Sequence, residues 1–282
     1  MKLLDGKKVA DQIIKGLKKT VGTFQTPPGL AFILVGSNSA SQTYVRMKKK
    51  KCQEIGIVSK DLQFEEDISE KELLKHIQAL NRDPTVDGIL IQQPLPKHLL
   101  ALVEAIAPSK DVDGFHPVNI GRLLLGETDG FVPCTPLGIQ RLLCEYDISL
   151  KGKHVVILGR SNIVGKPLAA LLVQKNPQAN ATVTLAHTAT QNLKELTLSA
   201  DILVAAMGSH HFVRSSMVKK GTVVIDVGIN RHGSKITGDV DFDEVAPKTS
   251  FITPVPGGIG PMTIAMLMSN TLLSYERKKN LS

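Results

Sequence analysis

Tyr44 and Lys48 stand four residues apart in a stretch whose pattern predicts a helix over residues 40–54. Side chains at positions i and i+4 lie on the same face of a helix, so we expect these two to be neighbours. A lysine beside a tyrosine in a binding site can have its pKa lowered and then take part in proton transfer. Lys48 also opens the run Lys48–Lys51, so an ordinary solvated helix face is the alternative interpretation.

Gln92 and two aspartates supply further polar groups. Gln92 follows a predicted strand over residues 86–91, and ligands of open α/β sheets bind at the carboxyl ends of the strands. The alternative is that Gln92 and Gln93 simply end that strand. Asp111 and Asp113 lie in a polar loop, where they can orient a substrate amine, hold a cation or stabilise a turn. No third ligand stands nearby in the sequence, so we predict no metal site.

A second region is typical of a phosphate site. Residues 155–158 predict a short buried strand, a turn begins at Gly159, and a helical pattern follows over residues 164–175. A strand, a turn and a helix start in this order direct free backbone N–H groups and the helix dipole at one point, which suits a phosphate. The spacing G-x-G-x-x-G is absent, so an ordinary strand–turn–helix corner is the alternative.

The residues after the next predicted strand, 181–186, bear on which nicotinamide cofactor would bind. An NAD site usually has an acidic residue about 20 residues beyond the glycine turn, where it binds the ribose 2′-hydroxyl. Residues 180–192 contain no acidic residue. Arg160 in the turn and the hydroxyl of Thr188 suit a 2′-phosphate instead. The sequence therefore favours NADP over NAD.

The segment Pro256–Gly260 contains three glycines within four residues. Such a segment is costly to order, so we interpret it as a loop that contacts a ligand or as a hinge rather than as a simple connection.

The elements that must position these residues alternate between strand and helix, which is typical of a parallel α/β fold. Strands are predicted over residues 30–35, 58–64, 86–91, 154–158, 181–186, 201–206 and 222–226. Helices are predicted over residues 4–21, 40–54, 97–106, 135–146, 164–175, 191–198, 214–219 and 262–274, and after the capping box that joins Ser69 to Glu72. No flexible linker separates the two series, so we expect two α/β lobes joined by a helix.

Composition limits the classes of protein to which the chain can belong. It has 282 residues, of which 42% are hydrophobic and 21% charged, as in a soluble globular protein. Its 34 Lys and Arg exceed its 26 Asp and Glu by 8, which suits anionic partners. With 3 Tyr, 8 Phe and no Trp, anionic small molecules are favoured over nucleic acid. No apolar run predicts a membrane span, and 3 cysteines without C-x-x-C spacing indicate reduced thiols in a cytoplasmic protein.

Taken together, five motifs resemble the bifunctional methylenetetrahydrofolate dehydrogenase/methenyltetrahydrofolate cyclohydrolase family over nearly the whole chain. In chain order they are Tyr44–Lys48, Asp87–Pro96, Lys110–Phe115, Gly159–Pro167 and Pro254–Thr263. The resemblance implies oxidation of 5,10-methylenetetrahydrofolate to 5,10-methenyltetrahydrofolate with NADP, followed by hydrolysis to 10-formyltetrahydrofolate.

The resemblance also implies a division into domains. Residues 1–138 and the C-terminal helix, residues 262–282, would form a tetrahydrofolate-binding catalytic domain with a parallel sheet. Residues 139–261 would form a Rossmann-type NADP-binding domain. A homodimer and a folate substrate that can carry a polyglutamyl tail are implied as well.

Individual roles follow from the same resemblance. Lys48 would be the catalytic lysine, with Tyr44 beside it against the folate. Gln92 would hydrogen-bond Lys48 and tune its protonation, while Asp113 would anchor the pterin ring. The other residues expected at the folate are Ile91, Gln93, Pro256, Gly257, Gly258, Ile259 and Gly260. The residues expected at NADP are Gly159, Arg160, Ser161, Thr188 and Ile229.

Two positions depart from the family pattern. Gln93 stands where an aliphatic residue is usual, which makes that wall of the folate pocket more polar, and Thr188 replaces a commoner serine but keeps the hydroxyl. The alternatives are an enzyme with only one of the two activities and, from another class, a catalytically silent protein that binds NADP or folate. A nucleic-acid-binding role is the least favoured.

Overall fold

The computed structural model describes residues 1–232 and 235–280, and in it the chain forms two compact α/β units. The six-stranded unit consists of Met1–Ala10 and Thr135–Thr263. The three-stranded unit consists of Asp11–Cys134 and the chain from Ile264 onward. Parallel sheets in two units confirm the predicted fold class.

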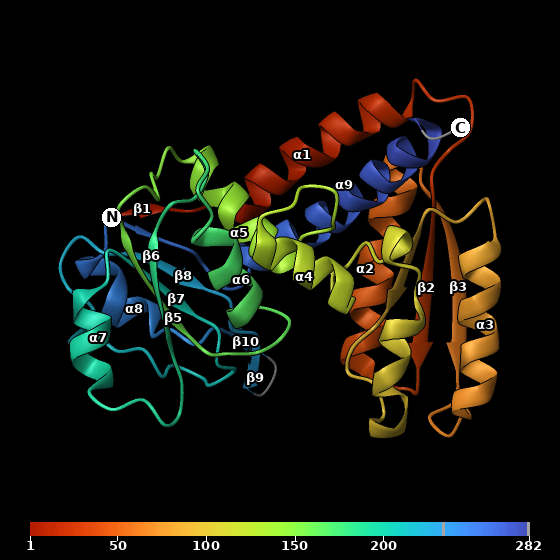
Figure 1. The fold of residues 1–282 in the computed structure, drawn as a ribbon. Helices are drawn as coiled ribbons and strands as arrows, with labels where there is room; N and C mark the ends of the chain where they lie inside the picture. Colours follow the sequence, from red (N-terminus) through yellow and green to blue (C-terminus); the bar gives the residue numbers. More distant parts are fainter. Residues whose placement is uncertain (233–234, 281–282) are drawn as a thin grey trace. The chain divides into compact units, whose positions relative to one another are not determined.

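The sheet of the three-stranded unit has β2 in its centre. The strand order is β3 (Val58–Phe64), β2 (Gly29–Val35) and β4 (Gly88–Ile91), and both pairings are parallel. Every residue of β2 is buried, as expected for a parallel strand covered on both faces. Helices α2 (Ser39–Ile55) and α3 (Glu70–Arg82) lie on opposite sides of this sheet (Figure 1).

Local signals explain where these two helices begin and end. The Asn38 side chain accepts a hydrogen bond from Ser41 N at the start of α2, and Gly56 ends that helix with a φ of 97°. Ser69 Oγ accepts from Glu72 N at the start of α3, as the capping box predicts. Helix α2, which carries Tyr44 and Lys48, is therefore fixed at both ends by its own sequence.

Helices α1 (Gly6–Val21) and α9 (Ile259–Asn280) each contribute residues to both units. From Ile264 onward α9 packs in the three-stranded unit, where Asn270 Nδ2 donates to the carbonyl oxygens of Val112 and Val132. This confirms that the C-terminal helix joins the first lobe. The helix is longer than the 262–274 pattern predicts, and residues 281–282 of the expected helix lie outside the described residues.

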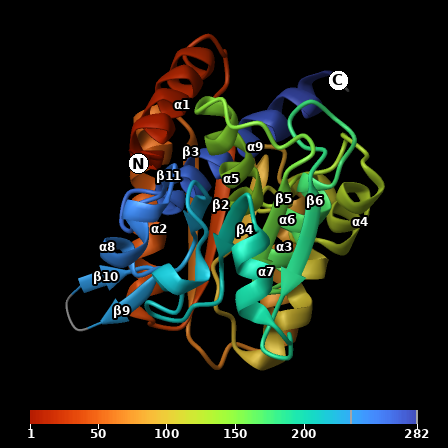
Figure 2. The same cartoon turned by 90° about the vertical axis from the view of Figure 1, so that its left-hand side faces the viewer.

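The sheet of the six-stranded unit is parallel throughout, and Figure 2 shows β5 and β6 side by side. Its strand order is β1 (Lys2–Leu3), β11 (Phe251–Ile252), β8 (Val223–Asp226), β7 (Ile202–Ala205), β5 (His154–Leu158) and β6 (Thr182–Ala186). The chain runs from β5 to β6 on one side and returns to β7 on the other. The carboxyl end of β5 is therefore a switch point, the place where such sheets bind ligands.

The remaining elements of this unit surround that sheet. They are α5 (Cys134–Glu145), α6 (Gly165–Leu172), α7 (Leu193–Ser199), α8 (Phe242–Val245), η4 (Ala246–Lys248) and the antiparallel hairpin of β9 (Asn230–His232) and β10 (Lys235–Thr237). In the part of the chain that the structure describes, no helix is both long and apolar enough to cross a bilayer.

Several predicted elements were wrong in type or extent. The segments predicted as helices over 97–106 and 214–219 are 3₁₀ helices, η1 (Lys97–Ala105) and η3 (Ser215–Met217), because apolar spacing does not separate a period of 3.0 from 3.6 in short segments. The helix predicted over residues 135–146 begins one residue earlier, at Cys134, and ends at Glu145.

Other elements were missed. Helix α4 (Pro117–Leu125) follows the short 3₁₀ turn η2 (Pro108–Lys110) and begins after His116, whose Nδ1 accepts from Val118 N. Strands β1 and β11 have two residues each, which is too short for a period-2 pattern to show.

Candidate active site

Lys48 and Gln92 form a hydrogen bond inside the three-stranded unit. Lys48 Nζ donates to Gln92 Oε1 over 3.0 Å, and the lysine is only 8% exposed. Gln92 directly follows β4, so its backbone is fixed by the sheet. Gln92 Nε2 donates to the carbonyl oxygen of Gln93 over 2.8 Å, which orients the amide so that its oxygen points to the lysine. The pair thus joins α2 to the carboxyl end of β4.

The surroundings of Lys48 favour its neutral amine. Burial lowers the pKa of Lys48, and the nearby Asp113 and Cys134 act in the opposite direction. Burial also raises the pKa of Asp113, against the opposing effect of Lys48. A lysine whose pKa is brought down from its usual value can gain and lose a proton during a reaction near neutral pH.

The loop that carries Asp113 is held by its neighbour Asp111. The Asp111 carboxylate accepts from Phe115 N over 3.2 Å, His116 N over 2.8 Å and Asn119 Nδ2 over 2.8 Å. Burial raises the pKa of Asp111 to about 6. Of the interpretations open for the two aspartates, Asp111 is therefore a turn-forming residue, while Asp113 lies in the electrostatic environment of Lys48.

Cys134 is a member of this site that sequence reasoning missed. Its buried Sγ donates to the Val112 carbonyl oxygen over 3.3 Å, and burial together with Asp113 raises the pKa of the thiol. A lone cysteine at a helix start gives no signal of its own, so only the packing of residues 111–134 reveals that Cys134 is near Lys48.

The other residues expected at the folate in this unit surround the same place. Tyr44 precedes Lys48 by one helical turn on α2 and is partly buried, and Ile91 is the buried last residue of β4. The Gln93 side chain accepts from Leu95 N over 3.3 Å, so its polarity is used within its own loop. Among residues 1–232 and 235–280, no three His, Cys, Asp or Glu side chains are placed to hold a metal ion.

A separate cavity of about 570 Å³ lies in the six-stranded unit at the carboxyl ends of β5, β6 and β7. Its wall contains one cationic side chain, that of Arg160, and hydroxyl groups, but no carboxylate. The lining residues are Leu158, Gly159, Arg160, Ser161, Ala186, His187, Thr188, Thr190, Leu193, Ala206, Met207, Ser209 and Phe212.

The two glycines of the turn after β5 are required by close backbone contacts. A Cβ on Gly159 would lie 2.2 Å from the Ala206 carbonyl oxygen, and one on Gly165 would lie 2.2 Å from the Gly159 carbonyl oxygen. Ser161 Oγ accepts from Val164 N over 3.1 Å and from Gly165 N over 3.4 Å, so it stabilises the start of α6. The tight turn and the absence of carboxylates suit a phosphorylated ligand.

Four of the five residues expected at NADP line this cavity, and Ile229 does not; the side chain of Ile229 is 47% exposed. Sequence reasoning missed Met207 and Ser209, which also line the cavity. The Asp239 carboxylate accepts from Met207 N, Gly208 N and Ser209 N over 2.7 to 2.9 Å and so fixes this loop. The position of the loop at the end of β7 was the available signal.

The glycine-rich segment Pro256–Gly260 makes close backbone contacts within the six-stranded unit. Lys7 N donates to the Gly257 carbonyl oxygen over 2.8 Å, and a Cβ on Gly6 would lie 2.0 Å from the Gly258 carbonyl oxygen. Close approach of the segment therefore requires glycine at position 6, whereas Gly258 is required by its own loop, since a Cβ there would lie 2.5 Å from the Pro254 carbonyl oxygen. The expected contact of the segment with folate stays a prediction.

Comparisons with known proteins agree along the whole chain. Residues 4–113 match the family model of the tetrahydrofolate dehydrogenase/cyclohydrolase catalytic domain, and residues 133–279 match that of its NAD(P)-binding domain. The "Bifunctional protein FolD" of Chlamydia abortus is 53% identical, covering 98% of this chain and 99% of the relative.

Solved structures are similar as well. The bifunctional FolD dehydrogenase/cyclohydrolase of Campylobacter jejuni has a TM-score of 0.95 and 51% identity, covering 99% of both chains. The Trypanosoma brucei dehydrogenase-cyclohydrolase, solved with NADP and an inhibitor, has a TM-score of 0.91 and 36% identity, covering 97% of both chains.

Proposed function

The chain belongs to the tetrahydrofolate dehydrogenase/cyclohydrolase family, and we propose that it catalyses both reactions, oxidation of 5,10-methylenetetrahydrofolate and hydrolysis of the resulting 5,10-methenyl compound to 10-formyltetrahydrofolate. The observation that carries this proposal is the buried Lys48 hydrogen-bonded to Gln92. In this proposal the three-stranded unit is the folate-binding catalytic domain and the six-stranded unit is the NADP-binding domain. The expected bounds, residues 1–138 with the C-terminal helix and residues 139–261, differ from these units mainly in Met1–Ala10, which belong to the six-stranded unit.

The cavity at the switch point of the six-stranded sheet is the NADP site. Residues of this cavity would hold NADP, which would supply the acceptor for a hydride from the methylene carbon of the folate. Arg160 and Thr188 bind the 2′-phosphate, since a guanidinium and a hydroxyl suit it and no acidic residue lines the wall. The turn at Gly159 and Ser161 holds the other phosphates. This step needs orientation of the reactants rather than an acid or base.

Lys48 acts in the hydrolytic step. Water bonds to the methenyl carbon and loses one proton, which is released. The bond from that carbon to N5 then breaks as the new hydroxyl loses its proton and becomes the formyl oxygen, and N5 takes up one proton. Lys48 holds and moves these protons, because its burial makes the neutral amine accessible and Gln92 fixes its position. Asp113 anchors the pterin ring, and Tyr44 lies against the folate together with Ile91 and Gln93.

The expected partners complete this proposal. The excess of basic residues suits the phosphates of NADP and a polyglutamyl tail on the folate. We expect a homodimer that works in the cytoplasm without nucleic acid or membrane as a partner.

Lys48→Met tests the assignment, with Lys50→Met as its matched control. Lys50 lies on the same helix and in the same lysine run, but its side chain is exposed. Hydrolysis is followed by the loss of absorbance of the methenyl compound. It should disappear in Lys48→Met and persist in Lys50→Met, while both variants still bind NADP.

Full hydrolytic activity in Lys48→Met would overturn the role of the lysine. Separate assays of the two steps in the unaltered protein distinguish the bifunctional enzyme from one with a single activity. Binding of NADP or folate without turnover in either step would favour the catalytically silent alternative.

A further inference from the structure

The three-stranded unit contains a further cavity, of about 870 Å³, at the amino end of β4. Gln92 follows the opposite end of this strand, so the cavity is separated from the Lys48 site by the length of β4. Its wall is built by the start of β4, the η2 turn, α4, the loop that follows α4, and α9. The lining residues are Val86, Asp87, Pro108, Ser109, Lys110, Arg122, Asp129, Phe131, Ser274, Arg277, Lys278 and Asn280.

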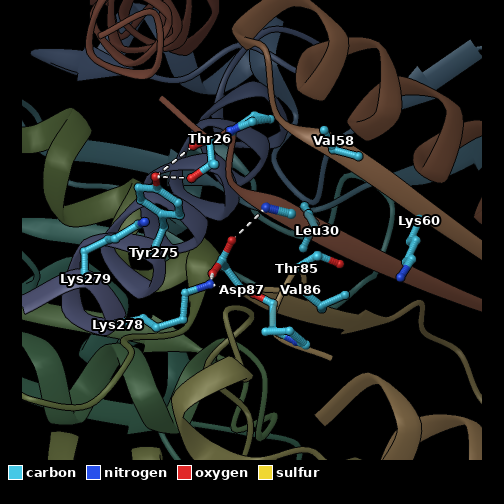
Figure 3. Close-up of a pocket in the computed structure, with 13 residues that line it drawn as sticks. Thr26, Leu30, Val58, Lys60, Thr85, Val86, Asp87, Tyr275, Lys278 and Lys279 are labelled. Atoms are coloured by element: carbon cyan, nitrogen blue, oxygen red, sulfur yellow. Dashed lines mark hydrogen bonds and ion pairs between the residues drawn. The ribbon is translucent and has the colours of Figure 1, made fainter. Parts of the chain in front are cut away.

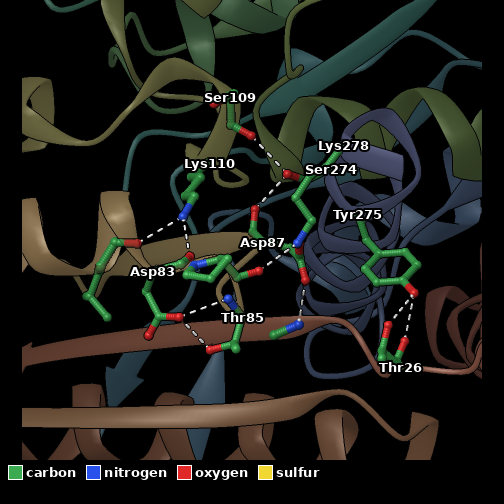
Figure 4. Close-up of polar contacts among 12 residues, drawn as sticks. Thr26, Asp83, Thr85, Asp87, Ser109, Lys110, Ser274, Tyr275 and Lys278 are labelled. Atoms are coloured by element: carbon green, nitrogen blue, oxygen red, sulfur yellow. Dashed lines mark hydrogen bonds and ion pairs between the residues drawn. The ribbon is translucent and has the colours of Figure 1, made fainter. Parts of the chain in front are cut away.

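Cationic side chains outnumber carboxylates in this wall by four to two. Two of the cations have carboxylate partners. Lys278 forms an ion pair with the buried Asp87 (Figure 4), and Arg122 Nη1 lies 3.2 Å from a carboxylate oxygen of Asp129. These two pairs leave Lys110 and Arg277 as the excess positive charge of the cavity.

Arg277 is held in place by groups that carry no net charge. Its guanidinium donates to the carbonyl oxygens of Thr128 over 2.9 Å and Asp129 over 2.8 Å, and both Nη atoms donate to the Gly130 carbonyl oxygen over 3.4 Å. A guanidinium has five N–H donors, so these four bonds leave Nε–H for a ligand. The guanidinium also lies over the Phe131 ring at 5.0 Å. Within the described part of the chain no carboxylate forms an ion pair with it. Burial lowers the pKa of Arg277, and Arg122 lowers it further against the effect of Asp129.

Lys110 has the same kind of environment. Its Nζ donates to the carbonyl oxygens of Leu80 over 2.9 Å and Asp83 over 2.8 Å (Figure 4). An ammonium has three donors, so these bonds leave one for a ligand. Burial lowers the pKa of Lys110, and the like charge of Lys278 adds to this effect. Lys110 and Arg277 thus line the same cavity, and each is held there by backbone carbonyl oxygens.

A neighbouring cavity of about 470 Å³ can be compared with the larger one by the partners of its cations (Figure 3). It shares Val86, Asp87 and Lys278 with the first cavity, and its Lys60 forms an ion pair with Asp83. Lys279 lies over the Tyr275 ring at 5.6 Å. In the smaller cavity Lys60 is thus held by a carboxylate and Lys279 by an aromatic ring, whereas Lys110 and Arg277 of the larger cavity are held by backbone carbonyl oxygens.

We propose that the larger cavity binds a compact oxyanion carrying at least two negative charges, a phosphate or polycarboxylate group of a small metabolite, through Lys110 and Arg277. Pinned donors bind such a group at little entropic cost, because their side chains are already ordered. The site is distinct from the NADP and folate sites and does not depend on the proposed reactions.

Calorimetric titration of the full chain with inorganic pyrophosphate, and separately with citrate, tests the proposal. Saturating NADP keeps these anions from the Arg160 cavity. If NADP does not bind, titration of Arg160→Gln without NADP serves the same purpose, because this variant lacks the cation of that cavity. We expect saturable binding of at least one anion at constant ionic strength. The anion that binds more tightly distinguishes a phosphorylated ligand from a polycarboxylate.

Lys110→Gln should weaken the binding by about tenfold, the effect of losing one charge-assisted hydrogen bond. Lys110 Nζ also donates to two backbone carbonyl oxygens, so its replacement can disturb the local structure as well as the binding. Arg122→Gln therefore serves as a second variant, which should also weaken the binding. Arg122 is partly exposed, and its loss leaves Asp129 free to offset the charge of Arg277. Arg141→Gln is the matched control, since Arg141 forms an exposed ion pair with Glu145 in the six-stranded unit.

Absence of saturable binding of both anions to the unaltered protein overturns the proposal. Equal affinity in the unaltered protein, Lys110→Gln, Arg122→Gln and Arg141→Gln overturns it as well, because the anion would then bind elsewhere.

Discussion

Gln92→Glu changes the charge beside Lys48 with little change in size. The neutral amide oxygen that now accepts from Lys48 Nζ at 3.0 Å would become a carboxylate oxygen. An opposite charge favours the ammonium form, so the pKa of Lys48 rises. At 3.0 Å and an effective dielectric constant near 20, the attraction is about 5.5 kcal/mol, or about four pKa units. Burying the new carboxylate offsets part of this, and we expect a rise of about one to two units.

The assay is the pH dependence of methenyl hydrolysis, corrected for the uncatalysed rate. Whether Lys48 acts as the neutral base or as the ammonium acid, the limb of the profile that it governs should move to higher pH in Gln92→Glu. The dehydrogenase step should keep its pH profile, since hydride transfer requires no proton transfer from Lys48 in this mechanism.

Gln93→Glu is the matched control for Gln92→Glu. It adds the same charge one residue further along, where the side chain bonds to Leu95 N instead of to the lysine. The reasoning is refuted if Gln92→Glu leaves the hydrolytic profile in place, or if Gln93→Glu moves it by the same amount.

Three further predictions concern the six-stranded unit. Arg160→Gln should weaken NADP binding by about tenfold or more and NAD binding much less, because only NADP offers a 2′-phosphate; equal losses in fluorescence titrations would reject this role. Gly165→Ala should lower the melting temperature and the NADP affinity, because its Cβ would lie 2.2 Å from the Gly159 carbonyl oxygen. Gly121→Ala, at a position surrounded by open space, should lower neither, and similar effects of both variants would contradict the packing argument. Burial raises the pKa of Asp226 to about 6, so its contribution to stability is present at acid pH and is lost as the pH rises through 6. In urea unfolding, the stability of the wild type relative to Asp226→Asn should therefore increase by about 2 kcal/mol between pH 7 and pH 4.5, and a constant difference would be evidence against the shift.

The sequence predicted the elements that carry the chemistry because each has a strong local signal. Helix α2 has an N-cap at Asn38 and a C-terminal glycine at Gly56, and β4 is a continuous apolar run. The turn at Gly159 follows another apolar strand. Resemblance to a family then connected Lys48 with Gln92, two residues that the pattern alone left as separate possibilities.

Contacts between distant residues left no such signal. Cys134 approaches Lys48 only through the packing of the chain around Asp111, and Asp239 fixes the loop at Met207–Ser209 from 30 or more residues away. A carboxylate that binds backbone N–H groups imposes no pattern on the sequence of the loop that it holds. For the same reason the cations of the 870 Å³ cavity could not be grouped from sequence, since they come from three separate segments.

The position of Gln92 is set by the sheet rather than by a loop. Gln92 N donates to the Ile33 carbonyl oxygen over 2.8 Å, which continues the parallel register that pairs Ile33 with Ile91. Helix α2 follows β2 after a turn at Gly36, so the lysine and the glutamine are attached to two neighbouring, fully buried strands. At the other end of β4, Asp87 accepts from Gly29 N over 2.8 Å and pairs with Lys278, which fixes the strand against slipping. The Lys48–Gln92 hydrogen bond of 3.0 Å therefore depends on strand register, so that changes in the following loop, such as the polar Gln93, leave its geometry in place.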